Sequence, residues 1–444
     1  MIASSIVCGG CGAEVPPSEP YPFRCPRAGE LPGNDHVLRR VLDPGAVAFP
    51  DGPADETFVH YRHLLHPYHL GIAAGMDDAE LAGILRRLDH SVARVAGRGF
   101  LPTPFETAPP LAARIGLGGD LFVKDETQNV SGSHKARHLF GVLFHLEVME
   151  RLGLVAMPAP PLAIASCGNA ALAAAVVASA AGRGLQVFVP TDASPVVLRR
   201  LTELGADVVV CERDPAVPGD PTYHRLLRAL DEGAIPFTCQ GNLNGLAIEG
   251  GETLGWEMAS SLAASGRSIE HVVVQVGGGA LASAVAQSLR EAADLSALRG
   301  MPAVHTVQTE GAAPLQRAYE RVVALLPATP TYDDITTALA TAASRRSEFM
   351  WPWEEPPHSV AHGILDDETY DWLAVVEAML RTGGRSVVVS EDELVEANRA
   401  AVEATGVDVD ETGSAGLAGL IQLVRGGAIS GGESAAVLFT GVRR

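Results

Sequence analysis

The two lysines of this sequence, Lys124 and Lys135, lie in one short stretch, and every other strongly basic side chain is an arginine. A guanidinium stays protonated in proteins, whereas a lysine amine can lose its proton and attack a carbonyl carbon. Lys135 follows Ser131-Gly-Ser-His134 at a predicted helix start, so it is a candidate Schiff-base lysine. A composition biased towards arginine, or a solvated lysine behind a helix N-cap, would give the same pattern.

A second stretch whose residues could take part in chemistry connects a predicted strand at 162–165 to a predicted helix that begins at 169. Small and hydroxyl-bearing residues at a helix N-terminus suit a carboxylate, because several N–H donors converge there. Cys167 as a nucleophile is the alternative, but no histidine lies near it in the sequence. We predict that this loop binds a substrate carboxylate through Ser166, Cys167, Gly168 and Asn169.

A third stretch, a run of three glycines, joins a predicted strand at 272–276 to a predicted helix at 280–293. Glycines allow backbone amides to approach a phosphate closely. The same residues satisfy the dinucleotide pattern G-x-G-x-x-A, with Glu310 as a candidate ligand of a ribose. The turn alone therefore leaves open a small phosphate or the dinucleotide of an NAD-dependent dehydrogenase. Its residues are Gly277, Gly278, Gly279, Ala280 and Leu281.

A Schiff-base lysine, a carboxylate loop and a phosphate loop together describe pyridoxal phosphate bound to an amino acid. In this order the three stretches resemble the motifs of the β family of pyridoxal-phosphate enzymes, which is fold type II, the tryptophan synthase β superfamily. Asp410–Leu417 resembles the start of that family's C-terminal helix of small residues, and Leu438–Gly441 resembles its terminal strand. The resemblance covers roughly residues 100–444.

Within the superfamily the chain is most similar to the threonine synthase branch. Cys8-Gly-Gly-Cys11, the segment Ile248–Glu257 and the segment Gln308–Pro314 are similar to stretches of that enzyme. The resemblance implies a lyase or synthase that acts on a small amino acid with a hydroxyl or phosphate-ester leaving group on Cβ or Cγ, through an aldimine at Lys135. It also implies that His134 contacts the cofactor, Thr440 the pyridine nitrogen, Asn169 the ring hydroxyl and Gly277 to Leu281 the phosphate.

Three positions depart from the threonine synthase pattern. Ala136-Arg137 stands where Asp-Arg is usual, and Ala170 where a threonine usually follows the loop asparagine. These positions bear on the substrate phosphate of threonine synthase. His134 is more like tryptophan synthase β, whose chemistry runs through an aminoacrylate. An ammonia-lyase or dehydratase that eliminates a β substituent, or a synthase that replaces one, is therefore the alternative.

Short apolar strands that alternate with helices predict parallel sheets covered on both faces. We expect an α/β fold of two open parallel-sheet domains with the cofactor between them. One comprises 36–130 and 245–444 and binds the cofactor; the other comprises 131–244 and carries the substrate loop. The expected strands are 121–123, 162–165, 185–189, 208–210, 272–276, 304–307, 386–389 and 435–439. The expected helices are 76–96, 135–152, 169–182, 195–204, 221–232, 246–264, 280–293, 391–405 and 413–425.

The stretch from 327 to 370 is rich in prolines and aromatic residues, so we expect it to be irregular. Four of its side chains are candidates for covering the site: Trp351, Trp353, His358 and His362. Packing in a core explains the tryptophans equally well.

Residues 1–35 are expected to form a separate element that resembles a zinc ribbon, with Cys8, Cys11 and Cys25 as candidate metal ligands. Ala28 stands where the second turn of a ribbon would supply a fourth ligand. His36 is a possible replacement, and a ribbon that has lost its metal is the alternative.

The composition restricts the classes of partner. A net charge of −20 over 444 residues argues against non-specific binding to nucleic acid or to an anionic membrane. The N-terminus lacks the pattern of a secretory signal, and the six cysteines form no disulfide framework, so we expect a cytoplasmic enzyme. Its expected partner is a small-molecule amino-acid substrate, and the family resemblance implies a homodimer.

Overall fold

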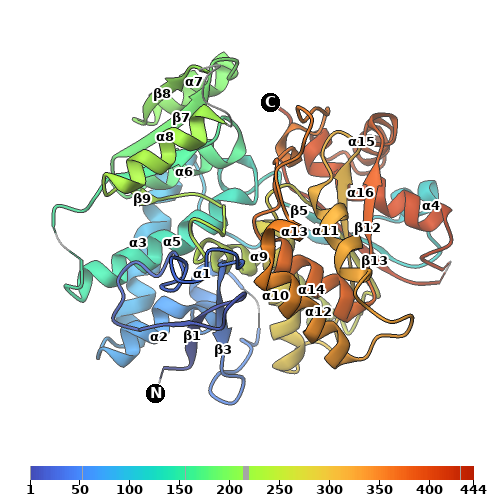
Figure 1. Cartoon of the computed structure of the whole chain (residues 1–444), viewed down its shortest axis with the longest axis horizontal. Coiled ribbons are helices and arrows are strands. Elements are labelled where there is room, and N and C mark those ends of the chain that lie inside the picture. Colours follow the sequence, from blue (N-terminus) through green and yellow to red (C-terminus); the bar gives the residue numbers. More distant parts are fainter. Residues whose placement is uncertain (1, 53, 156, 214–219, 431) are drawn as a thin grey trace.

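The computed structural model describes residues 2–52, 54–155, 157–213, 220–430 and 432–444. Its strands form three sheets, of which two are parallel or nearly so, and these two lie in separate halves of the molecule (Figure 1). Among the helices of the described ranges, none combines the length and apolar character needed to cross a lipid bilayer. The expected α/β architecture is confirmed.

The large sheet has the strand order β12-β11-β10-β13-β5-β4, and only β4 runs antiparallel to its neighbour. Its strands are β4 (Phe105–Thr107), β5 (Leu121–Asp125), β10 (His271–Gln275), β11 (Ala303–Thr309), β12 (Ser386–Val389) and β13 (Ala435–Phe439). The helices of this half are α4 (Pro109–Ile115), α9 (Ala247–Ser265), α10 (Ala280–Asp294), α11 (Pro314–Val323), α12 (Tyr332–Ser344), α13 (Arg346–Phe349), α14 (Trp372–Thr382), α15 (Glu391–Thr405) and α16 (Glu411–Arg425).

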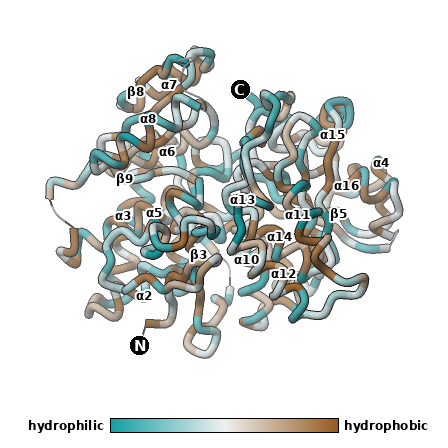
Figure 2. The backbone as a smooth tube through the Cα atoms, viewed as in Figure 1, coloured by the Kyte–Doolittle hydropathy of each residue, from teal (hydrophilic) through white to brown (hydrophobic). Residues whose placement is uncertain are grey.

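Continuous apolar strands form this sheet because both of its faces are covered. Val272 and Val274 of β10 pack into the core on the side of α9, α10 and α14. Val273, which points to the opposite face, packs into the core on the side of α15 and α16. Side chains alternate between the faces of a strand, so every residue of a doubly covered strand must be apolar or paired. In Figure 2 hydrophobic colour predominates along α16, whereas many loops are hydrophilic.

The second parallel sheet has the order β8-β7-β6-β9. Its strands are β6 (Leu162–Ala165), β7 (Leu185–Pro190), β8 (Asp207–Cys211) and β9 (Ile235–Pro236), and its helices are α5 (Lys135–Arg151), α6 (Asn169–Ala180), α7 (Pro195–Glu203) and α8 (Pro221–Asp231). The chain enters this half after β5 and returns to the large sheet through α9 (Figure 1). Loops of both sheets can therefore meet between the halves.

The N-terminal strands form a small antiparallel sheet in the order β2-β1-β3. They are β1 (Ser4–Cys8), β2 (Glu14–Val15) and β3 (Leu38–Leu42), and the helices α1 (Thr57–His60), α2 (His66–Ala73) and α3 (Asp78–Ala96) follow. Ser4 of β1 pairs with Leu42 of β3, so this sheet extends beyond residue 35. Three short 3-10 helices, Arg62–Leu64, Val130–Gly132 and His362–Ile364, complete the secondary structure of the described chain.

The expectation that 327–370 is irregular is wrong for its first half, where α12 and α13 lie. Thr331 and Asp334 cap α12 reciprocally, with Asp334 N 3.2 Å from Thr331 Oγ1 and Thr331 N 2.9 Å from an Asp334 carboxylate oxygen. Pro327 and Pro330 precede this helix and the other prolines of the stretch follow α13, while three alanines of α12, Ala338, Ala342 and Ala343, face the core. The prolines therefore lie at the boundaries of the helical part of this stretch and do not interrupt its helices.

Candidate active site

Lys135 is the first residue of α5, at the point where the chain leaves the large sheet. Two residues earlier, Ser133 pairs with Gly441 in an antiparallel bridge, which fixes the lysine next to the end of β13. Lys135 is partly exposed as a residue, and its positive charge opposes the rise that burial causes in the pKa of Cys239, Asp366 and Asp371. Lys135 therefore lies where loops of both halves converge.

Lys124, the other lysine, is buried in an ion-pair cluster and has a structural role instead. It is fully buried in β5, and its Nζ lies 2.5 Å from a carboxylate oxygen of Glu257. Arg137 of α5 contacts Glu257 at 2.7 Å and Glu126 at 2.9 Å, so two cations and two anions neutralise one another. Burial opposes ionisation of Glu257, but the charges of Arg137 and Lys124 lower its pKa to about 2. This cluster anchors the first turn of α5 beneath Lys135.

His134 and Thr440 lie side by side behind the lysine. His134 Nδ1 donates to the Thr440 carbonyl oxygen at 3.4 Å. Burial, reinforced by the charge of Lys135, lowers the pKa of His134 well below its ordinary value, so the imidazole is neutral. Gln275 Nε2 donates to Thr440 Oγ1 at 2.8 Å and to the Gly413 carbonyl oxygen at 2.7 Å. The Thr440 hydroxyl accepts this bond, which leaves its own proton free to donate to a ligand.

The predicted carboxylate loop reaches the same place. Asn169 is the first residue of α6, and a Cβ placed on Gly441 would lie 3.0 Å from its Nδ2 atom. Ser166, Cys167 and Gly168 precede it at the surface, and Gly168 N lies 3.4 Å from Ser166 Oγ. Although Cys167 is exposed as a residue, partial desolvation raises the pKa of its thiol, which disfavours a nucleophilic thiolate.

The triple-glycine turn lies at the N-terminus of α10, and Gly279 there has a φ of 99° that favours glycine. The segment 364–371 covers this turn. A Cβ on Gly277 would collide with the Asp366 carboxylate, and one on Gly278 would lie 2.9 Å from the Tyr370 ring. A backbone hydrogen bond from Gly278 stabilises the Asp366 carboxylate. The backbone N–H groups of such a turn can donate hydrogen bonds to an anion, as the phosphate of the expected cofactor requires.

Several buried polar atoms near the convergence point have no hydrogen-bond partner within the described part of the chain. They are Ser133 Oγ, His134 Nε2 and Gln240 Oε1. Buried polar atoms in proteins are nearly always satisfied, so such a group indicates a polar ligand. Together with the anion-accepting turn and the partly exposed lysine, these atoms fit an anionic aldehyde cofactor that carries ring polar groups.

Sequence reasoning missed two segments of this site. The loop after β9 brings Gly241 against Asp371, since a Cβ on Gly241 would collide with that carboxylate. Burial, reinforced by the Asp35 carboxylate, raises the pKa of Asp371 to about 8. The polar run Thr238–Asn242 after an apolar strand was the available signal for the first segment. For 364–371 the only signal was acidic residues inside an apparently irregular stretch.

The four side chains that we considered as covers are partly or fully exposed, and the main-chain N–H of Trp353 donates to the Asp367 carbonyl oxygen at 2.9 Å. Arg317 of α11 stacks on the Trp351 ring at 3.7 Å and lies 5.3 Å from the centre of the Trp353 ring. His358 and His362 are exposed. The tryptophans therefore pack against α11, which favours the packing interpretation. Cys8, Cys11 and Cys25 form a separate cluster with His36 in the N-terminal sheet.

Comparisons with known proteins agree with this geometry. A family model described as "Pyridoxal-phosphate dependent enzyme" matches residues 97–441. The chain is 26% identical over 345 residues to the threonine synthase of Methanosarcina acetivorans, covering 76% of this chain and 74% of that protein. It is 30% identical over 174 residues to the L-threonine ammonia-lyase of Thermotoga maritima, covering 39% of each.

Among solved structures, the chain is similar in fold to the processed form of threonine deaminase isoform 2 from Solanum lycopersicum. The TM-score is 0.58 at 17% identity, and the alignment covers 90% of this chain and 94% of that one. The family match extends over most of the sequence and includes every predicted motif from Lys135 to Thr440. The chain therefore belongs to the family of pyridoxal-phosphate-dependent enzymes, with fold type II as its architecture and pyridoxal 5′-phosphate as its cofactor.

Proposed function

We propose that this protein is a lyase or synthase that acts on a small amino acid carrying a leaving group on Cβ or Cγ. The observation that carries the proposal is the convergence of Lys135, the Asn169 loop, the triple-glycine turn and Thr440 from four separate segments. When bound, the cofactor supplies an electron sink that stabilises negative charge at the substrate Cα. NAD-dependent oxidation is not proposed, because the family match over residues 97–441 supports pyridoxal phosphate as the cofactor.

Each residue of the site has a role that follows from its position. The amides of the glycine turn would hold the phosphate, and the Thr440 hydroxyl would donate a hydrogen bond to the ring nitrogen. Asn169 and the N-terminus of α6 bind the ring hydroxyl and the substrate carboxylate. Lys135 holds the cofactor in the resting enzyme. Its Nζ, when not bound to the cofactor, would take the proton from the substrate Cα as a general base.

The leaving group is better matched by a hydroxyl than by a phosphate ester. Arg137 does not face the site: its guanidinium is fully buried and bound to Glu126, Glu257 and Thr253. Asp366 and Asp371 place two carboxyl groups near Lys135, and neither can pair with a substrate phosphate as an arginine would. We therefore favour β-elimination from a hydroxy amino acid, in which the hydroxyl leaves as water and hydrolysis gives a 2-oxo acid and ammonia.

The test of the cofactor site uses the chain's scarcity of lysines. Borohydride reduction of the purified holoenzyme, followed by peptide mass spectrometry, should place the cofactor on Lys135 and leave Lys124 unmodified. Lys135→Arg keeps the charge but should abolish both the label and turnover. A label at Lys124, or undiminished activity in Lys135→Arg, would overturn the proposed site.

The test of the substrate class is a panel of serine, threonine, O-acetylserine, phosphoserine and O-phosphohomoserine. We expect ammonia and a 2-oxo acid from serine or threonine. Release of inorganic phosphate and formation of threonine from O-phosphohomoserine would contradict the hydroxyl assignment and leave the Lys135 site intact. The division into domains, the homodimer and the cytoplasmic location stay predictions.

A further inference from the structure

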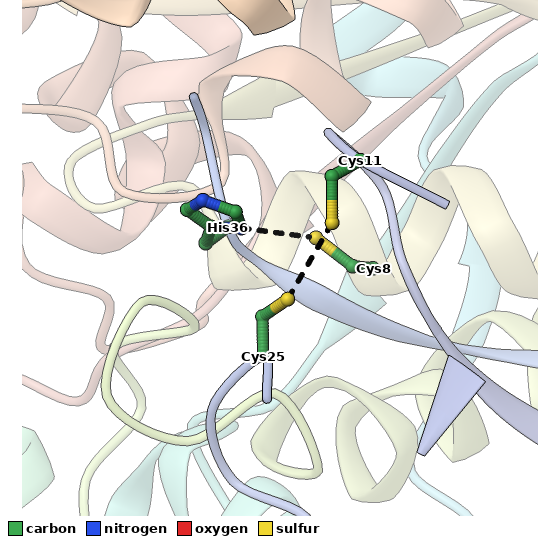
Figure 3. Close-up of side chains that lie close together, drawn as sticks. All are labelled: Cys8, Cys11, Cys25 and His36. Carbon is green, nitrogen blue, oxygen red and sulfur yellow. Dashed lines mark hydrogen bonds between the residues drawn. The ribbon is translucent and has the colours of Figure 1, made fainter. Parts of the chain in front are cut away.

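Three thiols and one imidazole converge at the N-terminal sheet (Figure 3). Their ligand atoms all lie within 4.8 Å of one another. Cys11 Sγ lies 3.5 Å from Cys25 Sγ, and Cys8 Sγ lies 3.6 Å from His36 Nδ1. A tetrahedral zinc ion with Zn–S bonds of about 2.3 Å would place its ligand atoms roughly 3.8 Å apart. The four atoms therefore have the spacing of a tetrahedral site.

The orientation of His36 is a second and independent indication of a metal. Its Nε2 donates to the Leu31 carbonyl oxygen at 2.8 Å, so the lone pair of Nδ1 faces the three sulfur atoms. A metal-binding histidine usually donates its other N–H to a carbonyl or carboxylate, which fixes the tautomer. Arg27 N, 3.4 Å from Cys25 Sγ, donates to that sulfur and would stabilise its thiolate.

Backbone packing explains how His36 reaches the position that Ala28 leaves open. The Cys8–Cys11 turn is closed by a hydrogen bond from Gly12 N to the Cys8 carbonyl oxygen at 3.0 Å. A Cβ on Gly10 would collide with the Asp35 carbonyl oxygen, so the turn rests directly on the chain that precedes His36. The fourth ligand thus comes from the segment before β3, not from a second Cys-x-x-Cys turn.

We propose that Cys8, Cys11, Cys25 and His36 bind one structural Zn²⁺. Three soft thiolates and one imidazole in a closed tetrahedron match zinc, and all four positions are protein ligands, which is the pattern of a structural site. Because the ligands come from β1, the turn after it and the chain before β3, the ion would hold the small sheet together.

The ion would also stabilise the contact between this sheet and the large half. Asp35, next to His36, accepts a hydrogen bond from Trp372 Nε1 at 3.1 Å and forms an ion pair with Arg346 at 3.3 Å. Trp372 is the first residue of α14, and Asp371 before it donates its N–H to the Gly278 carbonyl oxygen at 3.0 Å. A fixed His36 therefore keeps Asp35 against the segment that supports the glycine turn.

The test is the metal content of the purified full chain, expressed in zinc-supplemented medium and dialysed. Elemental analysis should find about one zinc ion per chain, and a thiol-blocking mercurial should release it to a chromophoric chelator. Replacement of zinc by cobalt should give the thiolate charge-transfer and tetrahedral bands of a sulfur-rich site. Cys11→Ser and His36→Ala should lose the metal, whereas Cys211→Ser, a half-buried cysteine outside the cluster, should retain it.

Measurements on the wild-type chain keep the proposal falsifiable if a variant fails to fold. Zinc below about one tenth of an ion per chain would overturn it. A mass two hydrogens lower, with Cys11 and Cys25 joined as a disulfide, would overturn it too, and so would equal loss of metal in Cys211→Ser. Chelation of zinc from the wild type should lower the thermal midpoint, and an unchanged midpoint would contradict the structural role. None of these readouts depends on catalysis, so they are independent of the proposed function.

Discussion

Gln275 determines which way the Thr440 hydroxyl points. Its Nε2 faces the carbonyl oxygens of Gly413 and Leu438 as well as Thr440 Oγ1, and carbonyls accept only from an N–H group. The Thr440 oxygen must therefore accept, and its proton must point elsewhere. A buried glutamine at the end of an apolar strand gives no functional signal in the sequence. The role of Gln275 follows only from three-dimensional contacts.

We expect Gln275→Leu to weaken cofactor binding about fivefold, because a Thr440 hydroxyl that Gln275 no longer orients loses on the order of 1 kcal/mol of its hydrogen bond to the ring nitrogen. Fluorescence titration of the apo-protein with pyridoxal phosphate measures this. Thr440→Val should have a similar effect, and the double variant should lose little more than either single one. Fully additive losses would show that the two side chains act separately. Circular dichroism controls for misfolding.

At the scale of elements, the glycines of α9 permit close helix crossings. A Cβ on Gly250 would overlap the Arg137 carbonyl oxygen of α5, and one on Gly251 would overlap the His138 ring. On another face, a Cβ on Gly255 would overlap Ser288 of α10. This is the segment that resembled threonine synthase in the sequence, and its glycines bring α9 onto the helix that begins with Lys135.

Gly250→Ala should therefore lower the free energy of unfolding by about 1–3 kcal/mol, since backbone atoms have little room to move apart. Gly83→Ala is the matched control in α3, where an added Cβ meets nothing within 4 Å. Alanine there should stabilise the helix by roughly 0.5–1 kcal/mol. Thermal and denaturant unfolding compare the two. An equal effect of both substitutions would contradict the close-crossing explanation.

The sequence predicted those parts of the site that are contiguous loops between a strand and a helix. Lys135, Asn169 and Gly277 each follow a strand and precede a helix, so local periodicity and composition located them. The cover at 364–371 was not predicted, because its position depends on packing between residues distant in the sequence. His36 was recognised as a possible ligand, but only the backbone contact between Gly10 and Asp35 explains why it points at the cysteines.

At the scale of the whole molecule, Arg40 joins the N-terminal sheet to two helices of the large half. It contacts Glu249 at 3.1 Å and Glu252 on α9, and Glu291 on α10 at 2.9 Å. The guanidinium is buried, as are the three carboxylates. Burial raises the pKa of Glu249 to about 7, although the charge of Arg40 opposes that shift. Arg40 thus supplies the positive charge that stabilises this buried acidic cluster.

We expect Arg40→Met to cost about 3–5 kcal/mol of unfolding free energy near neutral pH, because it leaves buried carboxylates unpaired. Without the charge of Arg40, the pKa of Glu249 would rise above its wild-type value of about 7 in the folded variant. Wild type and variant would therefore bind the same protons at this site below about pH 7, so the additional loss should grow as pH rises above about 7. Unfolding curves from pH 5 to pH 8 measure this slope.

Arg39→Met is the matched control at the adjacent position. Arg39 forms one ion pair, with Glu377 at 3.2 Å, and its side chain is 38% exposed. A partly exposed pair of this kind contributes about 1 kcal/mol or less. If Arg39→Met were as destabilising as Arg40→Met, the effect would come from general disruption of β3, not from the buried cluster.

The strand order of the large sheet has a consequence for synthesis on the ribosome. β13 lies between β10 and β5, yet it follows every other strand of that sheet in the chain. Until it emerges, the nascent protein carries two apolar strands, each with an edge that has no neighbour to pair with. Such edges are prone to aggregate. We therefore expect overproduced chains to require chaperone protection until the segment that ends at Thr440 has been translated.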